Sequence, residues 1–115
     1  MEADQKLKKD AGKLRYDLTP VEIEEKLARI FTFGIEKGYG EESWKKVEEK
    51  RYIAALRRHF AEYLKDPQSK DAESGELHIA HAMWNAGTLM WKAMQDEERE
   101  KKSVNISYSY AANRC

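Results

Sequence analysis

The chain has 115 residues, enough for one compact domain over residues 1–115 but not for two. Its 21 basic and 21 acidic residues cancel, so composition gives no support for nucleic acid or a membrane surface as partner. The single cysteine, Cys115, excludes an internal disulfide and suits a reducing cytoplasm, and there is no apolar run of about 18 residues to span a membrane.

The chain opens with a charged arm and a basic loop. Residues 1–10 have almost no apolar anchors and are expected to be flexible. In the basic loop that follows, up to residue 20, Gly12 frees the backbone, and Lys13, Arg15 and Tyr16 offer donors suited to phosphate oxygens. The glycine spacing of a P-loop is missing, so phosphate binding competes here with simple surface solvation.

Two helices are predicted next. Thr19-Pro-Val-Glu22 has the pattern of a capping box with proline at the first helical position, which predicts a helix over about 20–37. After Gly38-Tyr-Gly40 turns the chain, a second apolar stripe predicts a helix over about 41–65. His59 lies in that stripe, where it either faces a pocket or fills the core.

A third helix is predicted over about 75–102, after an acidic turn in which Ser74 is the candidate N-cap. His78, His81 and Asn85, spaced i, i+3 and i+7, fall on one polar stripe between two apolar faces of this helix. Because an unsatisfied polar group on a covered helix costs roughly 1–3 kcal/mol, these side chains need partners. They are either satisfied core residues or the lining of a functional pocket.

The last segment, residues 103–115, alternates apolar and polar side chains from Val104 to Tyr110, as a strand does. A lone strand needs a partner, so this tail is expected to pair with another copy, to lie across the helices or to be disordered.

The predicted fold is therefore an all-α domain of three main helices with an extended C-terminal tail. Two apolar faces on the third helix exceed what two other helices can cover, which predicts a homodimer or homotetramer that buries Trp84 or Trp91. The residues expected to be buried are Ile23, Leu27, Phe31, Leu56, Phe60, Met83, Met90 and Trp91.

The order of motifs along the chain resembles a phage-associated family. The motifs are Gly12-Lys-x-Arg-Tyr-Asp-Leu, Phe33-Gly ahead of Tyr39-Gly, Trp44, Arg51-Tyr-x-Ala-Ala-Leu-Arg-x-His59 and Glu73-Ser-Gly-x-x-His-x-Ala-His-Ala-x-x-Asn85. Over about residues 10–90 they are similar to the dATP/dGTP diphosphohydrolase (MazZ-type) domain. The resemblance implies an all-helical scaffold in a bacterial or phage-infected cell. It also implies metal-dependent hydrolysis of a purine deoxynucleoside triphosphate to the monophosphate and pyrophosphate.

The residue types present suit that reaction. Triphosphate cleavage needs a cation and an activated water, and Mg²⁺, with Mn²⁺ as the alternative, prefers oxygen ligands. The candidate metal ligands are Glu22, Glu25, Asp71 and Glu73. Histidine suits Mg²⁺ poorly and becomes a good ligand only for Mn²⁺, Zn²⁺ or Co²⁺. The candidate acid/base and phosphate-contacting residues are therefore His59, His78, His81 and Asn85. The candidate substrate-binding residues are Lys13, Arg15, Tyr16, Lys37 and Arg57.

Two other classes of function stay open. A structural or inhibitory phage protein with the same fold would leave nucleotides intact. A transition-metal-binding module would bind Zn²⁺ or Ni²⁺ through His78 and His81 without any nucleotide.

Overall fold

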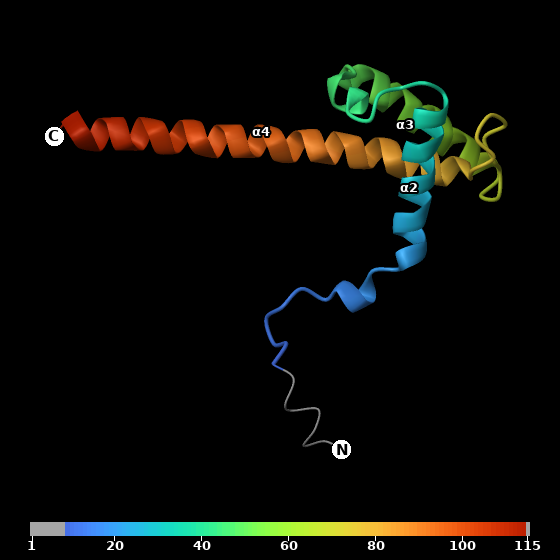
Figure 1. Cartoon of the computed structure of the whole chain (residues 1–115), viewed down its shortest axis with the longest axis horizontal. Helices are drawn as coiled ribbons and strands as arrows, with labels where there is room; N and C mark the ends of the chain where they lie inside the picture. Colours follow the sequence, from blue (N-terminus) through green and yellow to red (C-terminus); the bar gives the residue numbers. More distant parts are fainter. Residues whose placement is uncertain (1–8, 115) are drawn as a thin grey trace.

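The computed structural model describes residues 9–114, with side chains as far as Ser103, and confirms the all-α class with three α-helices in that range. The helices are α2 (Val21–Glu36), α3 (Glu49–Lys65) and α4 (His78–Arg114), with two short 3-10 helices, η1 (Tyr16–Leu18) and η2 (Ser43–Lys46). Figure 1 shows α3 packed beside the N-terminal end of α4, with α2 crossing the same end, so that the rest of α4 projects away. Most of the arm predicted at residues 1–10, and Cys115, lie outside the described residues.

The first helix lacks its predicted cap, and the second begins later than the sequence predicts. Pro20 is extended and precedes α2, and the Thr19 hydroxyl donates to the Tyr16 carbonyl at 2.7 Å, so the predicted capping box is not formed. The helix predicted over 41–65 begins only at Glu49, because the preceding segment turns through η2. There the Tyr52 hydroxyl donates to the Trp44 carbonyl, so a tertiary contact occupies that backbone acceptor.

The C-terminal segment also differs from the prediction, because α4 continues as helix to Arg114 instead of ending near residue 102 in an extended tail. The physical reason is hydrogen bonding. A strand needs a partner chain for its backbone groups, whereas a helix that is already nucleated gains one internal hydrogen bond with each added residue. Period-two alternation alone therefore did not decide the local structure.

The centre of the domain is an aromatic cluster with rings from α2, η2, α3 and α4. Its rings are Phe31, Trp44, Tyr52, Trp84 and Trp91, in edge-to-face contacts with centroids 4.9–5.8 Å apart. Such contacts stabilise by about 0.5–1.5 kcal/mol each beyond the area they bury. The cluster fixes the approach of η2 and α2 to α4.

The buried apolar core is smaller than predicted. In the part of the chain with described side chains it contains Ile30, Tyr52, Ala80 and Ala82. Of the residues expected to be buried, Ile23, Phe60 and Met90 are 47%, 44% and 63% exposed in the single chain. The reason is geometric: α2 crosses α4 rather than lying along it, and α4 extends beyond both other helices (Figure 1). Among the described helices, none combines the length and apolar character needed to cross a bilayer.

Candidate functional site

A tight turn leads from α3 into α4 and sets the geometry of the site. The backbone N–H of Asp71 donates to the Glu76 carbonyl, and that of Gly75 donates to the Asp71 carbonyl, both at 2.8 Å. The N–H of His78 donates to the Ser69 carbonyl at 2.9 Å, which anchors the first residue of α4. Gly75 has φ +76°, a conformation that favours glycine. Helix α4 thus begins at His78, three residues after the predicted start, and Ser74 is freed from capping.

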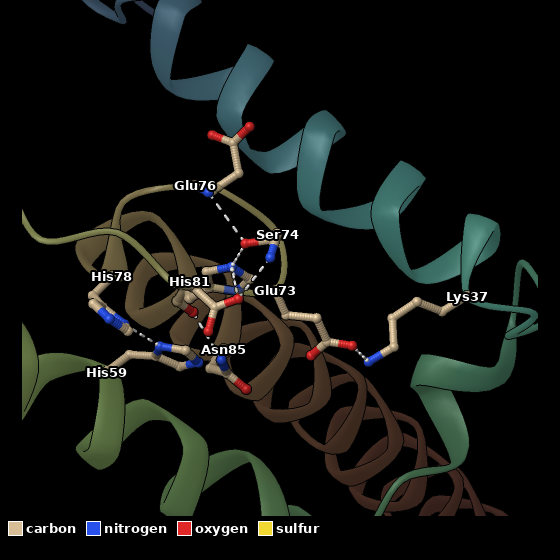
Figure 2. A network of polar contacts seen from close by, with 9 residues as sticks. Lys37, His59, Glu73, Ser74, Glu76, His78, His81 and Asn85 are labelled. Atoms are coloured by element: carbon tan, nitrogen blue, oxygen red, sulfur yellow. Dashed lines mark hydrogen bonds and ion pairs between the residues drawn. The ribbon is translucent and has the colours of Figure 1, made fainter.

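His59 of α3 faces His78 of α4, as Figure 2 shows. Their Nδ1 atoms are 2.9 Å apart, and both side chains are half-buried. Two histidines that are 19 residues apart in sequence thus point at one another. Since a hydrogen bond needs one donor and one acceptor, at least one of the two rings must present a lone pair at Nδ1.

His81 lies one turn further along α4 and completes the group. Its ring stacks on His59 with centroids 4.6 Å apart and an interplanar angle of 15°. Its Nε2 is 2.6 Å from the Ser74 hydroxyl and 3.9 Å from a carboxylate oxygen of Asp71. That oxygen also accepts the backbone N–H of Ser74 at 2.9 Å. We call these five side chains, namely His59, Asp71, Ser74, His78 and His81, the histidine cluster.

The environment of the histidine cluster shifts the pKa values of His59, His81 and Asp71. Burial lowers the pKa of His59, and the neighbouring His81 and His78 lower it further, against the opposite effect of Asp71. Burial also lowers the pKa of His81, despite the attraction of Asp71. Partial burial acts to raise the pKa of Asp71, but hydrogen bonds from Ser74 and the nearby imidazoles outweigh it and leave that pKa below its ordinary value. The cluster at neutral pH therefore pairs uncharged imidazoles at His59 and His81 with an ionised carboxylate.

Asn85 lies on the same stripe, but its side-chain amide contacts the backbone of α4. It is 4% exposed, and its Nδ2 donates to the His81 backbone carbonyl at 2.8 Å. Its own backbone carbonyl accepts the hydroxyl of Thr88 at 2.7 Å. These contacts brace the buried side of α4 behind His81.

The structure brings together only part of the predicted metal set. In the part of the chain with described side chains, one group has metal-ligand spacing: His59, Asp71 and His78, with ligand atoms within 4.8 Å of one another. Of the predicted carboxylates, Asp71 belongs to it, whereas Glu25 pairs with Arg29 at 2.9 Å and Glu73 pairs with Lys37 at 2.6 Å. Glu22 is exposed on the first turn of α2.

Of the predicted substrate-binding residues, only Lys37 contacts the turn that leads into α4. Lys13, Arg15 and Tyr16 are exposed in the basic loop, which Figure 1 shows leading away from the packed helices. There Arg15 forms two hydrogen bonds to Asp17, of 2.8 and 2.7 Å. Arg57 is exposed on α3. Lys37, in contrast, follows α2 directly and contacts the turn before α4 through Glu73 (Figure 2).

Beside Lys37 lies an open pocket that sequence reasoning missed. Its volume is about 430 Å³, and its lining includes four rings of the aromatic cluster, Phe31, Trp44, Tyr52 and Trp84, together with Phe33, Tyr39 and Arg51. The buried Nε1 of Trp84, a lining residue, has no hydrogen-bond partner among the described side chains. The apolar spacing of these residues was visible in the sequence, but such spacing is typical of a core as well. Ser74 was missed too, since the sequence indicated only a helix cap.

Comparison with known proteins gives one match. A family model described as dATP/dGTP diphosphohydrolase, N-terminal, matches residues 3–102. No curated protein and no solved structure shows a significant match.

Proposed function

The chain belongs to the dATP/dGTP diphosphohydrolase N-terminal family, and from this premise we propose that it hydrolyses a purine deoxynucleoside triphosphate to the monophosphate and pyrophosphate. The observation that supports this reaction is the histidine cluster. Three imidazoles, a serine hydroxyl and an ionised carboxylate converge at the junction of two helices. A separate open pocket is linked to the turn of the cluster by the ion pair between Lys37, which lines the pocket, and Glu73. Convergent polar groups with shifted pKa values are typical of active sites.

The cluster offers groups for activating water. An imidazole can accept a proton from water only in its neutral form, and the lowered pKa of His81 keeps its ring in that form. Ser74 and Asp71 lie at its Nε2 and orient the ring. We assign His81 as the base that takes the proton of the attacking water. A divalent cation, Mg²⁺ or Mn²⁺, would neutralise the phosphates when bound.

The aromatic pocket supplies a place for the nucleoside. Pockets for small ligands have volumes of about 300–1,000 Å³ and mostly apolar walls with a few polar groups. The pocket of about 430 Å³ fits this class, and aromatic rings bind purines by stacking. Lys37 lies at its edge, 5.7 Å from the Tyr39 ring centroid, and is paired with Glu73 of the turn. We place the base in the pocket and the phosphates along the path from Lys37 to the cluster.

The same proposal includes self-association as a dimer or tetramer. The radius of gyration is 20.5 Å, whereas a compact domain of similar size has about 13 Å. Trp84 and Trp91, which the sequence led us to expect at the interface, pack against rings of the same chain. Among the described side chains of α4, the exposed large apolar residues are instead Met90 and Met94, which are 63% and 52% exposed. A second copy covering α4 would bury this apolar surface. Light scattering at micromolar concentration should give at least twice the chain mass, and a monomeric mass would contradict this part.

The test of the reaction is a panel of deoxynucleoside triphosphates with Mg²⁺ or Mn²⁺, assayed for pyrophosphate and monophosphate. We expect turnover of dATP or dGTP and much less of the pyrimidine substrates. If every nucleotide stays intact with both metals in the folded protein, the alternative of a non-catalytic phage protein on the same fold replaces this proposal.

A further inference from the structure

Two imidazole nitrogens of the same kind face each other where α3 meets α4. Nδ1 of His59 and Nδ1 of His78 are 2.9 Å apart, and a carboxylate oxygen of Asp71 lies within 4.8 Å of both. We propose that these three side chains form a metal site and that it takes a first-row transition metal, such as Mn²⁺, Co²⁺ or Zn²⁺, rather than Mg²⁺. This inference deepens the proposed function, on which it rests for the role of the metal.

The donor atoms decide the class of metal. Mg²⁺ is usually bound through carboxylates, phosphates and water, all of them oxygen ligands. Two imidazoles and one carboxylate form a mixed set that suits first-row transition ions instead. A set of three protein ligands leaves coordination positions open, as in catalytic metal sites, so that water or a phosphate oxygen can complete the sphere.

The orientation of the two rings fits shared coordination. Two nitrogens bound at roughly 2.0–2.1 Å to one ion at about a right angle lie roughly 3 Å apart. The observed separation of 2.9 Å is close to that value. A simple N–H···N hydrogen bond also fits the pair, and it is the carboxylate of Asp71 within 4.8 Å of both nitrogens that makes the group a candidate metal site. Metal binding uses the Nδ1 lone pair of each ring and leaves each proton on Nε2.

The surroundings hold the three side chains in place and leave them reachable. The Asp71 carboxylate accepts the backbone N–H of Ser74, and His81 stacks against the His59 ring. Such outer contacts orient metal ligands. His59, Asp71 and His78 are each only half-buried, and the Asp71 side chain is 24% exposed, so an ion and a phosphate group have access from solvent.

The experiment measures metal binding without nucleotide. The full chain is stripped with a chelator and titrated with Co²⁺, followed by its visible absorption, and with Mn²⁺ and Mg²⁺ by calorimetry. We expect one Co²⁺ per chain, bound at least about 100-fold more weakly after His59→Ala or His78→Ala, because even outer-shell changes cost 10–100-fold. Glu97→Gln on the projecting part of α4 is the matched control and should bind as the unmodified chain does.

Two further variants keep the outcome clear if an alanine variant loses helicity by circular dichroism. His59→Asn and Asp71→Asn retain polarity and hydrogen bonding but weaken the ligand set, and both should reduce Co²⁺ affinity. The proposal is overturned if Co²⁺ binds these variants as tightly as the unmodified chain. It is equally overturned if Mg²⁺ binds as tightly as Mn²⁺, or if Glu22→Gln and Glu25→Gln weaken binding as much as the histidine variants do.

Failure of the metal site and failure of the proposed function give different results. Specific Co²⁺ binding at the histidines without pyrophosphate release from any nucleotide retains the metal site and removes the reaction. Turnover with Mg²⁺ alone, in a protein that binds no Co²⁺ through His59 and His78, retains the reaction and removes the metal site.

Discussion

The basic loop and the histidine cluster contain similar kinds of polar side chain, yet the structure uses them in opposite ways. In the loop, Arg15 pairs with Asp17 two residues away, and the Thr19 hydroxyl reaches only to Tyr16. In the cluster, His59 meets His78 across 19 residues of sequence. Local pairs of this kind form in any exposed loop, whereas long-range contacts exist only in the folded chain.

This difference indicates where chemistry is possible. A catalytic group must be held in one geometry before the substrate arrives, because ordering it during the reaction adds to the barrier. The cluster is held by the α3–α4 contact and by the backbone bonds of the turn. The loop lacks comparable long-range side-chain bonds in the described structure, so its donors are expected to contribute attraction rather than positioning.

The largest expected effect contrasts one residue from each region. His78→Ala should lower pyrophosphate release from dATP or dGTP by at least about 100-fold, because losing a metal ligand should cost more than the roughly 10–100-fold that changes around the ligands cost. Arg15→Ala should lower it by less than about threefold. Steady-state kinetics of both variants check the contrast, and an equal loss in the two would end the distinction between the regions.

A second contrast uses two glycines with nearly the same backbone conformation. Gly75 in the turn has φ +76° and Gly12 in the loop has φ +82°, and neither has a neighbouring atom that an added Cβ would meet. Gly75→Ala should cost about 1–2 kcal/mol of unfolding free energy, because the surrounding hydrogen bonds prevent relaxation. Gly12→Ala should leave the urea midpoint nearly unchanged, since the loop can adjust. Equal destabilisation would show that the loop is held as firmly as the turn.

The smallest effect concerns two lysines. Lys37→Ala should raise the KM for the nucleotide about three- to fivefold with little change in kcat, because it removes a charge that binds substrate and transition state alike. Lys13→Ala should leave KM within experimental error. A KM change confined to Lys13 would instead favour the basic loop as the phosphate contact.

The sequence indicated how the α4 residues of the histidine cluster are arranged, but it did not indicate how His59 of α3 or the carboxylates meet them. Helical spacing placed His78 and His81 on one stripe, since residues three apart on a helix share a face. It left the orientation of His59 open between pocket and core, because the contact between α3 and α4 depends on packing. The grouping of Glu22 and Glu25 with Asp71 required a particular approach of α2, which periodicity does not specify.

The same limit applies to the fold. The all-α class and the three helices followed from apolar periodicity and were confirmed. The predictions for the segment before Glu49 and for the C-terminal tail were wrong, because interactions outside the local sequence pattern decide both structures. The Tyr52 hydroxyl donates a hydrogen bond to the Trp44 carbonyl, and the tail forms its backbone hydrogen bonds within α4 rather than with a partner strand.

The aromatic cluster also gives the chain an intrinsic optical probe. All three tryptophans of the sequence, Trp44, Trp84 and Trp91, belong to this one cluster. Near-ultraviolet circular dichroism requires aromatic rings in fixed packing and disappears when that packing is lost. Its tryptophan bands in this protein therefore report the docking of α2 and η2 on α4 and are insensitive to the basic loop, whose aromatic side chain is Tyr16. A ligand that enters the adjacent pocket should change those bands without any added label.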